Sequence, residues 1–304
     1  MNYLILTVSV IFNLLTSGIL RNQFCKKHRK SDADLHALNA VSSVVAAVVL
    51  AVIFLVRDGL AAPSLYTALF GIVFGIVTAL CAITNMQALS CGPLSYTSVI
   101  CTCSVVIPSF SGLLFFNESV SPLQYVGAAV MLISFFFAVD TENDERRTSA
   151  RWFVFCLLCF IFNGSIGVMQ KVHQSSPHKD ELGAFLVIAF TVSALYSLFS
   201  MVYCRKKNDL PAEKGSLSSL LLYSLVCGGG IAFCNAANMY LSGVMDSIVL
   251  FPVLNGGSMI LTTACGLLLW KEKLQKRQVI GLVLGIAAIL LLCNTVPLLL
   301  RLFG

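Results

Sequence analysis

The side chains with the greatest capacity for chemistry in this sequence are amides and hydroxyls inside long apolar segments. They are Asn13, Asn85, Gln87, Tyr96, Asn163, Asn235, Asn238, Tyr240 and Asn255. Such groups donate and accept hydrogen bonds without carrying charge, so together they suit a small polar or zwitterionic solute. For any single amide the alternative is a bond between helices, which contributes about 0.6–2 kcal/mol. For the set as a whole we predict solute binding.

Residues suited to catalysis or metal binding are placed less favourably. The four histidines, at positions 28, 36, 173 and 178, lie in expected loops or at expected helix ends. Cys156 and Cys159 have the spacing of a redox or zinc pair, but no second pair accompanies them, and a thiol in an apolar run behaves as a small hydrophobe. The stretch 256–260 begins like a nucleophile elbow but lacks its last glycine. We therefore expect no catalytic residue, metal or cofactor.

The composition is that of an integral membrane protein. Of the 304 residues 58% are hydrophobic and 11% charged, whereas soluble domains are about one quarter charged. A bilayer core about 30 Å thick takes about 20 apolar residues per helix. Ten runs meet this need, approximately Tyr3–Leu20, Leu35–Val56, Leu65–Leu89, Leu94–Phe116, Pro122–Val139, Arg151–Val172, Leu182–Cys204, Leu217–Leu241, Asp246–Trp270 and Gln278–Leu300. No acidic or basic residue falls near the middle of a run, so we expect no proton relay of the usual kind.

The basic residues indicate topology rather than a partner. Most of the 20 lie in four alternate loops, which follow the first, fifth, seventh and ninth runs. Basic loops are cytoplasmic by the positive-inside rule, so both termini are expected outside the plasma membrane. The net charge of +6 is explained in this way, and we expect no nucleic-acid partner.

A short motif occurs twice, 154 positions apart. The paired residues are Gly112 with Gly266, Glu118 with Glu272, Gln124 with Gln278, and Gly127 with Gly281. Two unrelated helix ends would seldom share this spacing, so the motif indicates an internal duplication. Both glutamates fall at expected membrane edges, and we interpret them as structural residues rather than solute ligands.

The residues after each glutamate open the last helix of each half. In the first copy Ser121 and Pro122 suit an N-cap and a first-turn proline, with Glu118 available to the positive end of that helix. In the second copy Gln275 and Lys276 occupy these places, so the sequence predicts that the cap is lost.

A charged stretch at 140–147 divides five runs from five. Because five is odd, the second half must enter the membrane from the opposite side. The sequence therefore predicts an all-α membrane protein with ten transmembrane helices in two inverted repeats, 1–140 and 151–304, joined by a cytoplasmic linker at 141–150. Asn13 and Asn163, on the first helix of each half, support the division. Irregular backbone is expected at Pro108 and in the stretch 252–257, which holds Pro252 and two further glycines. For the glycines 228–230, a bend and close packing of a neighbouring helix are equally expected.

This arrangement resembles the EamA-type members of the drug/metabolite transporter superfamily. The resemblance rests on two five-helix halves, each with a Gly-Leu-Leu helix end, a Glu, and a Gln-x-x-Gly entering the last helix. It implies transport of small solutes by alternating access through a central cavity between the halves. The small four-helix multidrug relatives use a carboxylate in their first helix, whereas this chain carries Asn13 there, which argues against their proton-exchange mechanism.

Transport of a small polar or zwitterionic metabolite is therefore the leading hypothesis, by uniport or exchange. The expected partners are that solute and the lipid bilayer. A non-transporting membrane scaffold is the first alternative, although a scaffold has no need for amides repeated across inverted halves. An intramembrane enzyme is less favoured, because no nucleophile with a base, and no metal site, is found at depth.

Overall fold

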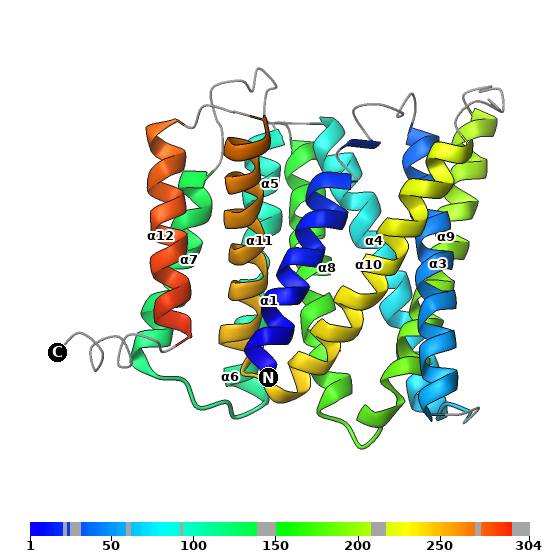
Figure 1. The fold of residues 1–304 in the computed structure, drawn as a ribbon, viewed down its shortest axis with the longest axis horizontal. Coiled ribbons are helices and arrows are strands. Elements are labelled where there is room, and N and C mark those ends of the chain that lie inside the picture. Colours follow the sequence, from blue (N-terminus) through cyan, green and yellow to red (C-terminus); the bar gives the residue numbers. More distant parts are fainter. Residues whose placement is uncertain are drawn as a thin grey trace. The chain divides into compact units, whose positions relative to one another are not determined.

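The computed structural model describes residues 1–20, 23–24, 32–58, 62–91, 94–138, 150–207, 217–270 and 275–293. All regular structure in these ranges is helical (Figure 1). The elements are α1 (Asn2–Asn13), η1 (Leu14–Leu20), α3 (Asp32–Asp58), α4 (Leu65–Cys91), α5 (Leu94–Cys103), α6 (Val106–Phe115), α7 (Pro122–Ala138), α8 (Ala150–Gln174), η2 (Lys179–Glu181), α9 (Leu182–Lys207), α10 (Leu217–Val244), α11 (Ser247–Trp270) and α12 (Lys276–Leu292).

Each of the ten predicted runs contains helix, and the all-helical class is confirmed for the described residues. Within the described residues, five stretches are long and apolar enough to cross a bilayer by themselves: His36–Val56, Leu65–Asn85, Ala150–Gln174, Lys179–Lys206 and Ser218–Val244. Shorter apolar helices lie at Asn2–Thr16, Ile100–Phe115, Pro122–Phe137 and Ser247–Ser258. The predicted linker lies largely outside the described residues, since the description resumes at 150.

The fourth predicted helix is broken into α5 and α6. Pro108 has no N–H to donate to the carbonyl of Ser104, and Ile107 N–H donates to that oxygen instead, at 3.0 Å. The N–H groups of Ser104 and Val105 likewise donate to the carbonyls three residues earlier rather than four. The expectation of irregular backbone at Pro108 is therefore confirmed.

The expected irregularity at Pro252 is wrong, and of the two alternatives for the glycines 228–230 the structure has close packing. Helix α10 runs unbroken through the glycines at 228–230, and α11 runs unbroken through Pro252. Gly228 instead admits the Ser42 carbonyl of α3, 2.6 Å from where a Cβ would stand, so the glycine serves close packing. An irregularity that the sequence did not predict is η1, a π-helix directly after Asn13.

The helices form two compact units. The first consists of Tyr3–Ala79 with Val172–Gly243, and the second of Leu80–Lys171 with Val244 onward. Each unit therefore contains helices from both sequence halves. The packing units and the predicted repeats are different divisions of one chain.

In the first unit α3 and α9 lie side by side (Figure 1). Glycines bring α4 close to α9: a Cβ at Gly75 would stand 2.7 Å from the carbonyl of Ala189. The buried core includes Leu50, Phe74 and Phe185. The helices of this unit therefore approach one another through glycine and backbone, at the close spacing typical of protein interiors.

In the second unit α7 pairs with α12 (Figure 1). Gly127 faces Leu291 and Leu292, and the Gln124 side chain donates to the carbonyl of Leu292 at 3.3 Å. Elsewhere in this unit the Trp152 indole donates to Thr97 at 2.8 Å, so a large aromatic is buried with its N–H satisfied.

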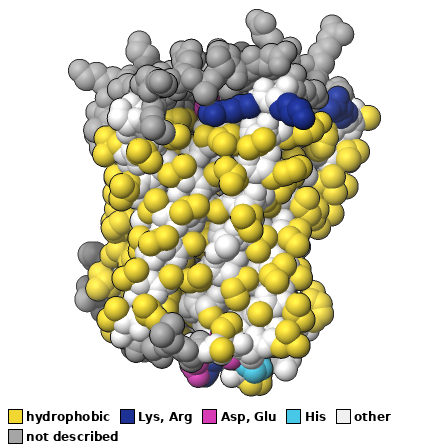
Figure 2. All heavy atoms as spheres, turned by 90° about the vertical axis from the view of Figure 1, so that its right-hand side faces the viewer, with side chains coloured by type: hydrophobic (Ala, Val, Ile, Leu, Met, Phe, Trp, Pro, Cys, Tyr) yellow, Lys and Arg dark blue, Asp and Glu magenta, His cyan; other side chains and the backbone are white. Residues whose placement is uncertain are grey.

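The surface has the pattern of a membrane protein. Figure 2 shows a broad band of hydrophobic side chains with Lys and Arg at one end and Asp, Glu and His at the other. Helix α9 connects two such ends, since Asp180 and Glu181 directly precede it and Arg205 and Lys206 fall in its last turn. Exposed large hydrophobics such as Phe199 (71% exposed) are costly in water but suited to lipid.

Candidate functional site

Among the predicted site residues, Asn163 lies at the helix break of the second unit. From α8 its amide donates to the Cys101 carbonyl at 3.2 Å and to the Ser104 hydroxyl at 2.6 Å. Ser104 also donates to the Cys101 carbonyl, at 2.6 Å. The amide therefore satisfies backbone that the break between α5 and α6 leaves without regular helical bonds.

Small residues let α8 approach this break closely. A Cβ at Gly164 would collide with Ile107, and one at Gly167 would stand 2.8 Å from Pro108. Gly167 also faces Phe251 of α11. The broken helix is thus held between α8 and α11, the kind of setting in which irregular backbone occurs at membrane depth.

Three other predicted amides are partly engaged. Asn235 and Asn255 each donate to the carbonyl four residues earlier on their own helix, at 2.9 Å. Their amide oxygens accept no hydrogen bond from the described residues. Asn238 accepts a bond from the Ser9 hydroxyl of α1 at 2.8 Å, a contact between helices of the first unit.

The side chains of Asn13 and Asn85 make no hydrogen bond with any described residue, and both are partly buried. Gln87 is also partly buried, two residues beyond Asn85 on α4, and Tyr240 is 39% exposed. The side chain of Tyr96 lies outside the described residues.

The predicted solute-binding residues are divided between the two units. Asn13, Asn235, Asn238 and Tyr240 belong to the first unit, whereas Asn85, Gln87, Asn163 and Asn255 belong to the second. The second unit therefore brings amides from both predicted repeats into one compact body, with the broken helix among them.

The glutamate of the first motif copy binds a helix start other than the expected one. Glu118 accepts the Ser247 N–H at 2.7 Å and the Ser247 hydroxyl at 2.9 Å, and so caps α11 rather than α7. The chain turns toward α11 at Asn117, whose φ of 50° is a left-handed conformation that Asn tolerates better than most residues. The sequence could not show this turn.

Gly112 makes room for this cap. A Cβ at Gly112 would collide with the Glu118 carboxylate and stand 2.9 Å from the Cβ of Ser247. The Glu118 N–H also donates to the Gly112 carbonyl at 3.2 Å, which fixes the turn between them. The fixed spacing of this glycine and glutamate is thus explained by one local structure.

Lys171 completes the site from α8. Its ammonium lies 2.6 Å from Glu118, and the two side chains are only 10% and 6% exposed. It also donates to the Met245 carbonyl at 3.2 Å, just before α11. Partial burial raises the pKa of nearby Asp246 above its usual range; Glu118 acts in the same direction and Lys171 opposes it.

The second motif copy retains its cap, contrary to the prediction. Gln275 is the N-cap of α12, and Gln278 reaches back to the Gln275 N–H at 3.0 Å, forming a capping box. The first copy forms the same box, with Gln124 accepting the Ser121 N–H at 2.9 Å. The repeated glutamine, rather than the serine, was therefore the informative residue.

The other three glycines of the motif lie within helices. Gly127 and Gly281 are buried in α7 and α12, and Gly266 lies in α11. Glu272 falls outside the described residues.

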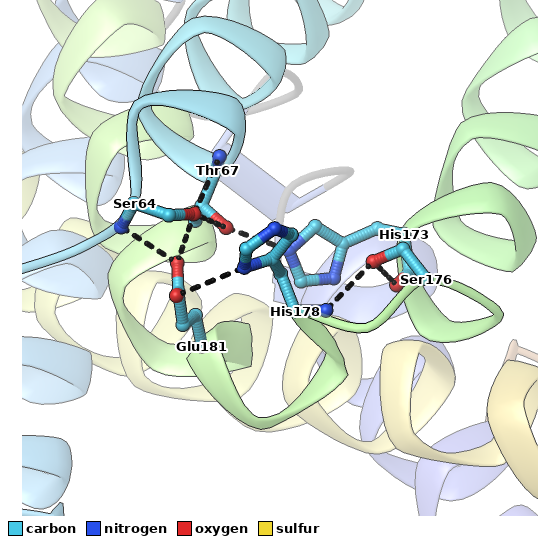
Figure 3. Close-up of polar contacts among 6 residues, drawn as sticks. All are labelled: Ser64, Thr67, His173, Ser176, His178 and Glu181. Carbon is cyan, nitrogen blue, oxygen red and sulfur yellow. Dashed lines mark hydrogen bonds and ion pairs between the residues drawn. The ribbon is translucent and has the colours of Figure 1, made fainter.

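The first unit contains a polar cluster that the sequence analysis did not single out (Figure 3). Glu181 accepts the Ser64 N–H at 2.9 Å and the Ser64 hydroxyl at 2.7 Å, and so caps α4. His178 lies 3.3 Å from the same carboxylate. Thr67 connects the cluster to His173, which is fully buried in the last turn of α8.

A signal for this cluster was present but weak. Ser64 precedes an apolar run, where a cap is expected, and Tyr66 and Phe70 are four apart, on one face of α4. Nothing local linked them to residues 173–181, which lie more than a hundred positions later.

All-helical structure, a duplicated motif and apolar helices define a membrane protein of a two-repeat class. A model of the EamA-like transporter family matches the chain over residues 22–139 and again over 150–294. The chain therefore belongs to the EamA-like transporter family and is an integral membrane protein of transporter type.

Other comparisons bear on the fold alone. No curated protein matches the sequence. A solved structure described as "Crystal structure of protein" is similar with a TM-score of 0.73 and 11% identity, over 96% of this chain and 98% of that one.

Proposed function

We propose that this protein carries a small polar or zwitterionic metabolite across the plasma membrane by alternating access. In this proposal all ten segments cross the bilayer, the halves 1–140 and 151–304 are inverted repeats joined at a cytoplasmic linker, and both termini face outside. The solute occupies a central cavity lined by helices of both repeats. Membership of a transporter family, with one family-model match in each half, supports this arrangement.

The main support for a small polar or zwitterionic solute is that uncharged side chains have hydrogen-bonding groups without partners among the described residues. Asn85 has no partner among the described residues, and the oxygen of Asn255 has none either. An amide left unsatisfied in an apolar setting costs about 1–3 kcal/mol by mutational estimates, so a ligand or water that bonds to it is favoured.

The position of the charged side chains also supports a neutral or zwitterionic solute. Within the described helices, Asp, Glu, Lys and Arg all lie within about one turn of a helix end. A solute with large net charge would lose its hydration without gaining an opposite charge there. A neutral or zwitterionic solute avoids that cost, because its own charges cancel.

The broken helix supplies a second kind of ligand group. The carbonyls near Ser104 have fewer regular helical partners, and Asn163 bonds one of them from α8. A solute ammonium or hydroxyl that binds such a carbonyl would compete with Asn163. Binding would then change the contact between α8 and the break, which links occupancy to helix position.

The experiment is a thermal-shift panel of amino acids, sugars and nucleosides on the purified full-length protein. A true ligand stabilises by about 2.7 kcal/mol at 100 times its Kd, so it raises the melting temperature in a dose-dependent manner. Counterflow of each hit in liposomes then measures transport. A folded protein that binds no solute and supports no counterflow would favour the scaffold alternative.

Asn85→Ala and Asn255→Ala are expected to weaken binding of the hit at least tenfold, the equivalent of about 1.4 kcal/mol. Thr191→Val is the matched control, because its hydroxyl bonds only the Val187 carbonyl of its own helix on an exposed face of α9. That control should leave affinity unchanged.

A further inference from the structure

The side chain of Asn163, in the second unit, has its two amide hydrogens engaged and its oxygen free. The NH2 group donates to the Cys101 carbonyl at 3.2 Å and to the Ser104 hydroxyl at 2.6 Å. An amide has two hydrogens on its nitrogen and two lone pairs on its oxygen. That oxygen receives no hydrogen bond from the described residues. The remaining capacity of this side chain is therefore that of an acceptor only.

Asn163 is exposed on the face of α8 that packs against α5. Cys156 and Cys159, seven and four residues earlier, are buried on this face and contact Thr97 and Cys101. Residues at these spacings share one side of a helix. The Asn163 side chain nevertheless is exposed. The free amide oxygen is therefore accessible at the place where α5 ends, on a side of α8 that packs against protein.

The end of α5 supplies a second acceptor, the carbonyl of Cys103. In a regular helix the Ile107 N–H would donate to this carbonyl, but it donates to that of Ser104 instead, at 3.0 Å. No N–H of the described residues donates to the Cys103 carbonyl. The last carbonyls of a helix also carry the negative end of its dipole, equivalent to about half an elementary charge. This end of α5 therefore favours a cationic group.

Helix α11 brings a third acceptor to the same level. The start of α11 lies at the end of α6, so the two helices run antiparallel. Phe251 and Pro108 both lie against Gly167 of α8, which places Phe251 level with the first turn of α6. Asn255 is one helical turn beyond Phe251, and therefore level with the break. Its NH2 group donates to the Phe251 carbonyl at 2.9 Å, while its oxygen accepts no bond from the described residues.

A buried hydroxyl beside the break also lacks a partner. Ser109, in the first turn of α6, is 2% exposed, and its Oγ makes no hydrogen bond with the described residues. Buried hydroxyls are nearly always bonded, so this one indicates a further polar group, supplied by a ligand or by water. The chain on both sides of the break therefore has unused hydrogen-bonding capacity.

The three free acceptors match one kind of solute group. A primary ammonium has three N–H groups and no lone pair, so it can donate one hydrogen bond to each acceptor. A hydroxyl can donate only one such bond. A carboxylate or phosphate oxygen accepts hydrogen bonds and gains nothing from further acceptors.

We propose that the break between α5 and α6 binds a primary ammonium group of the transported solute, through the side-chain oxygens of Asn163 and Asn255 and the carbonyl of Cys103. This inference rests on the proposed transport function and narrows its solute to an amine. The three acceptors carry no formal charge, so the solute supplies its own negative group, as an amino acid does. Sugars and nucleosides, which lack an ammonium group, fall outside this class.

The first test compares matched ligands on the unaltered full-length protein by thermal shift. Each amino acid that binds is compared with its N,N,N-trimethyl derivative, which keeps the positive charge but has no N–H, and with its 2-hydroxy acid. Both analogues should bind more weakly by about tenfold or more, because hydrogen bonds to a charged group are lost. One analogue is larger and the other smaller than the amino acid, so size does not explain a loss in both. Equal affinity of the amino acid and its trimethyl derivative would overturn the proposal.

The second test applies the same ligands to Asn255→Leu. Loss of the acceptor should weaken binding of the amino acid by about tenfold and leave that of the trimethyl derivative nearly unchanged. Ser165→Ala on α8 is the control, because its hydroxyl bonds only the Ile161 carbonyl of its own helix, at 2.8 Å. That control should bind both ligands as the unaltered protein does. Equal weakening of both ligands by Asn255→Leu would show a structural role and overturn the proposal.

A third comparison separates an amine from an inorganic cation, since sodium ions also bind oxygen acceptors at broken membrane helices. Melting temperatures in sodium chloride and in choline chloride should be equal without solute. A rise in sodium that no amine solute reproduces would assign the acceptors to a metal ion and overturn the proposal. Binding and counterflow of sugars or nucleosides alone would overturn it and leave the proposed function standing. Absence of any binding and any counterflow would instead reject the proposed function.

Discussion

Two helix starts in this molecule are capped in the same way, but their glutamates are paired with different side chains. In the second unit Glu118 binds the N–H and hydroxyl of Ser247, and in the first unit Glu181 binds the N–H and hydroxyl of Ser64. Glu118 is paired with a lysine, whereas Glu181 is paired with a histidine. The same cap is therefore paired with a lysine in one unit and with a histidine in the other.

Burial reinforces this difference. The Lys171 and Glu118 side chains are 10% and 6% exposed, while those of His178 and Glu181 are 38% and 29% exposed. A buried pair cannot lose one charge without leaving the other uncompensated. The Lys171–Glu118 pair is therefore the more enclosed of the two, and removal of one partner should cost more there.

The largest expected effect is that of Glu118→Ala. It leaves the Lys171 ammonium buried without a counter-charge and removes both bonds to Ser247, so it should destabilise the protein by about 3–5 kcal/mol. Thermal unfolding in detergent measures the loss. The double variant Glu118→Leu with Lys171→Met should recover most of the lost stability, because no buried charge remains. If stability is not recovered, the unpaired charge of Lys171 is not the cause of the loss.

Gly112→Ala comes next in expected size. Its methyl group would displace the Glu118 carboxylate from Ser247, at a cost of about 1–3 kcal/mol. Gly229→Ala is the matched control in a helix, since nothing lies within 4 Å of its Cβ position. That change should raise stability by about 0.5–1 kcal/mol through lost chain entropy. Similar melting temperatures for the two variants would argue against a spatial role for Gly112.

The smallest expected effect is that of Glu181→Gln. The amide can still accept from Ser64, so the loss is confined to the interactions of the carboxylate charge with the start of α4 and with His178, about 0.3–1 kcal/mol. Glu118→Gln, measured alongside, should cost several times more. Equal losses would show that Lys171 and His178 are equivalent partners and would remove the distinction between the two caps.

Much of the fold could be predicted from the sequence, because a bilayer allows few backbone structures. Apolar runs of about 20 residues have few alternatives to helix in a bilayer, and the motif at Gly112 and Gly266 revealed the duplication. The break near Pro108 was also expected, since a missing N–H is a local property. Pro252 had the same local signal, yet its helix continues.

The partners of individual side chains could not be predicted. Lys171 and Glu118 are 53 positions apart, and their pairing depends on how α8 packs beside the turn after α6. The cap at Gln275 was missed because glutamine is an unusual N-cap, and the partner that reveals it is Gln278. His173 was recognised as a helix-end residue, but its burial depends on Phe185 and Thr67 from other helices.

The central claim is that uncharged amides bind the transported solute, and counterflow of that solute through Asn85→Ala and Asn255→Ala tests it most directly. Both variants should fold, as judged by melting temperature, and both should bind and transport the solute at least tenfold less well than the Thr191→Val control. Unchanged affinity and unchanged counterflow in both folded variants would contradict the account.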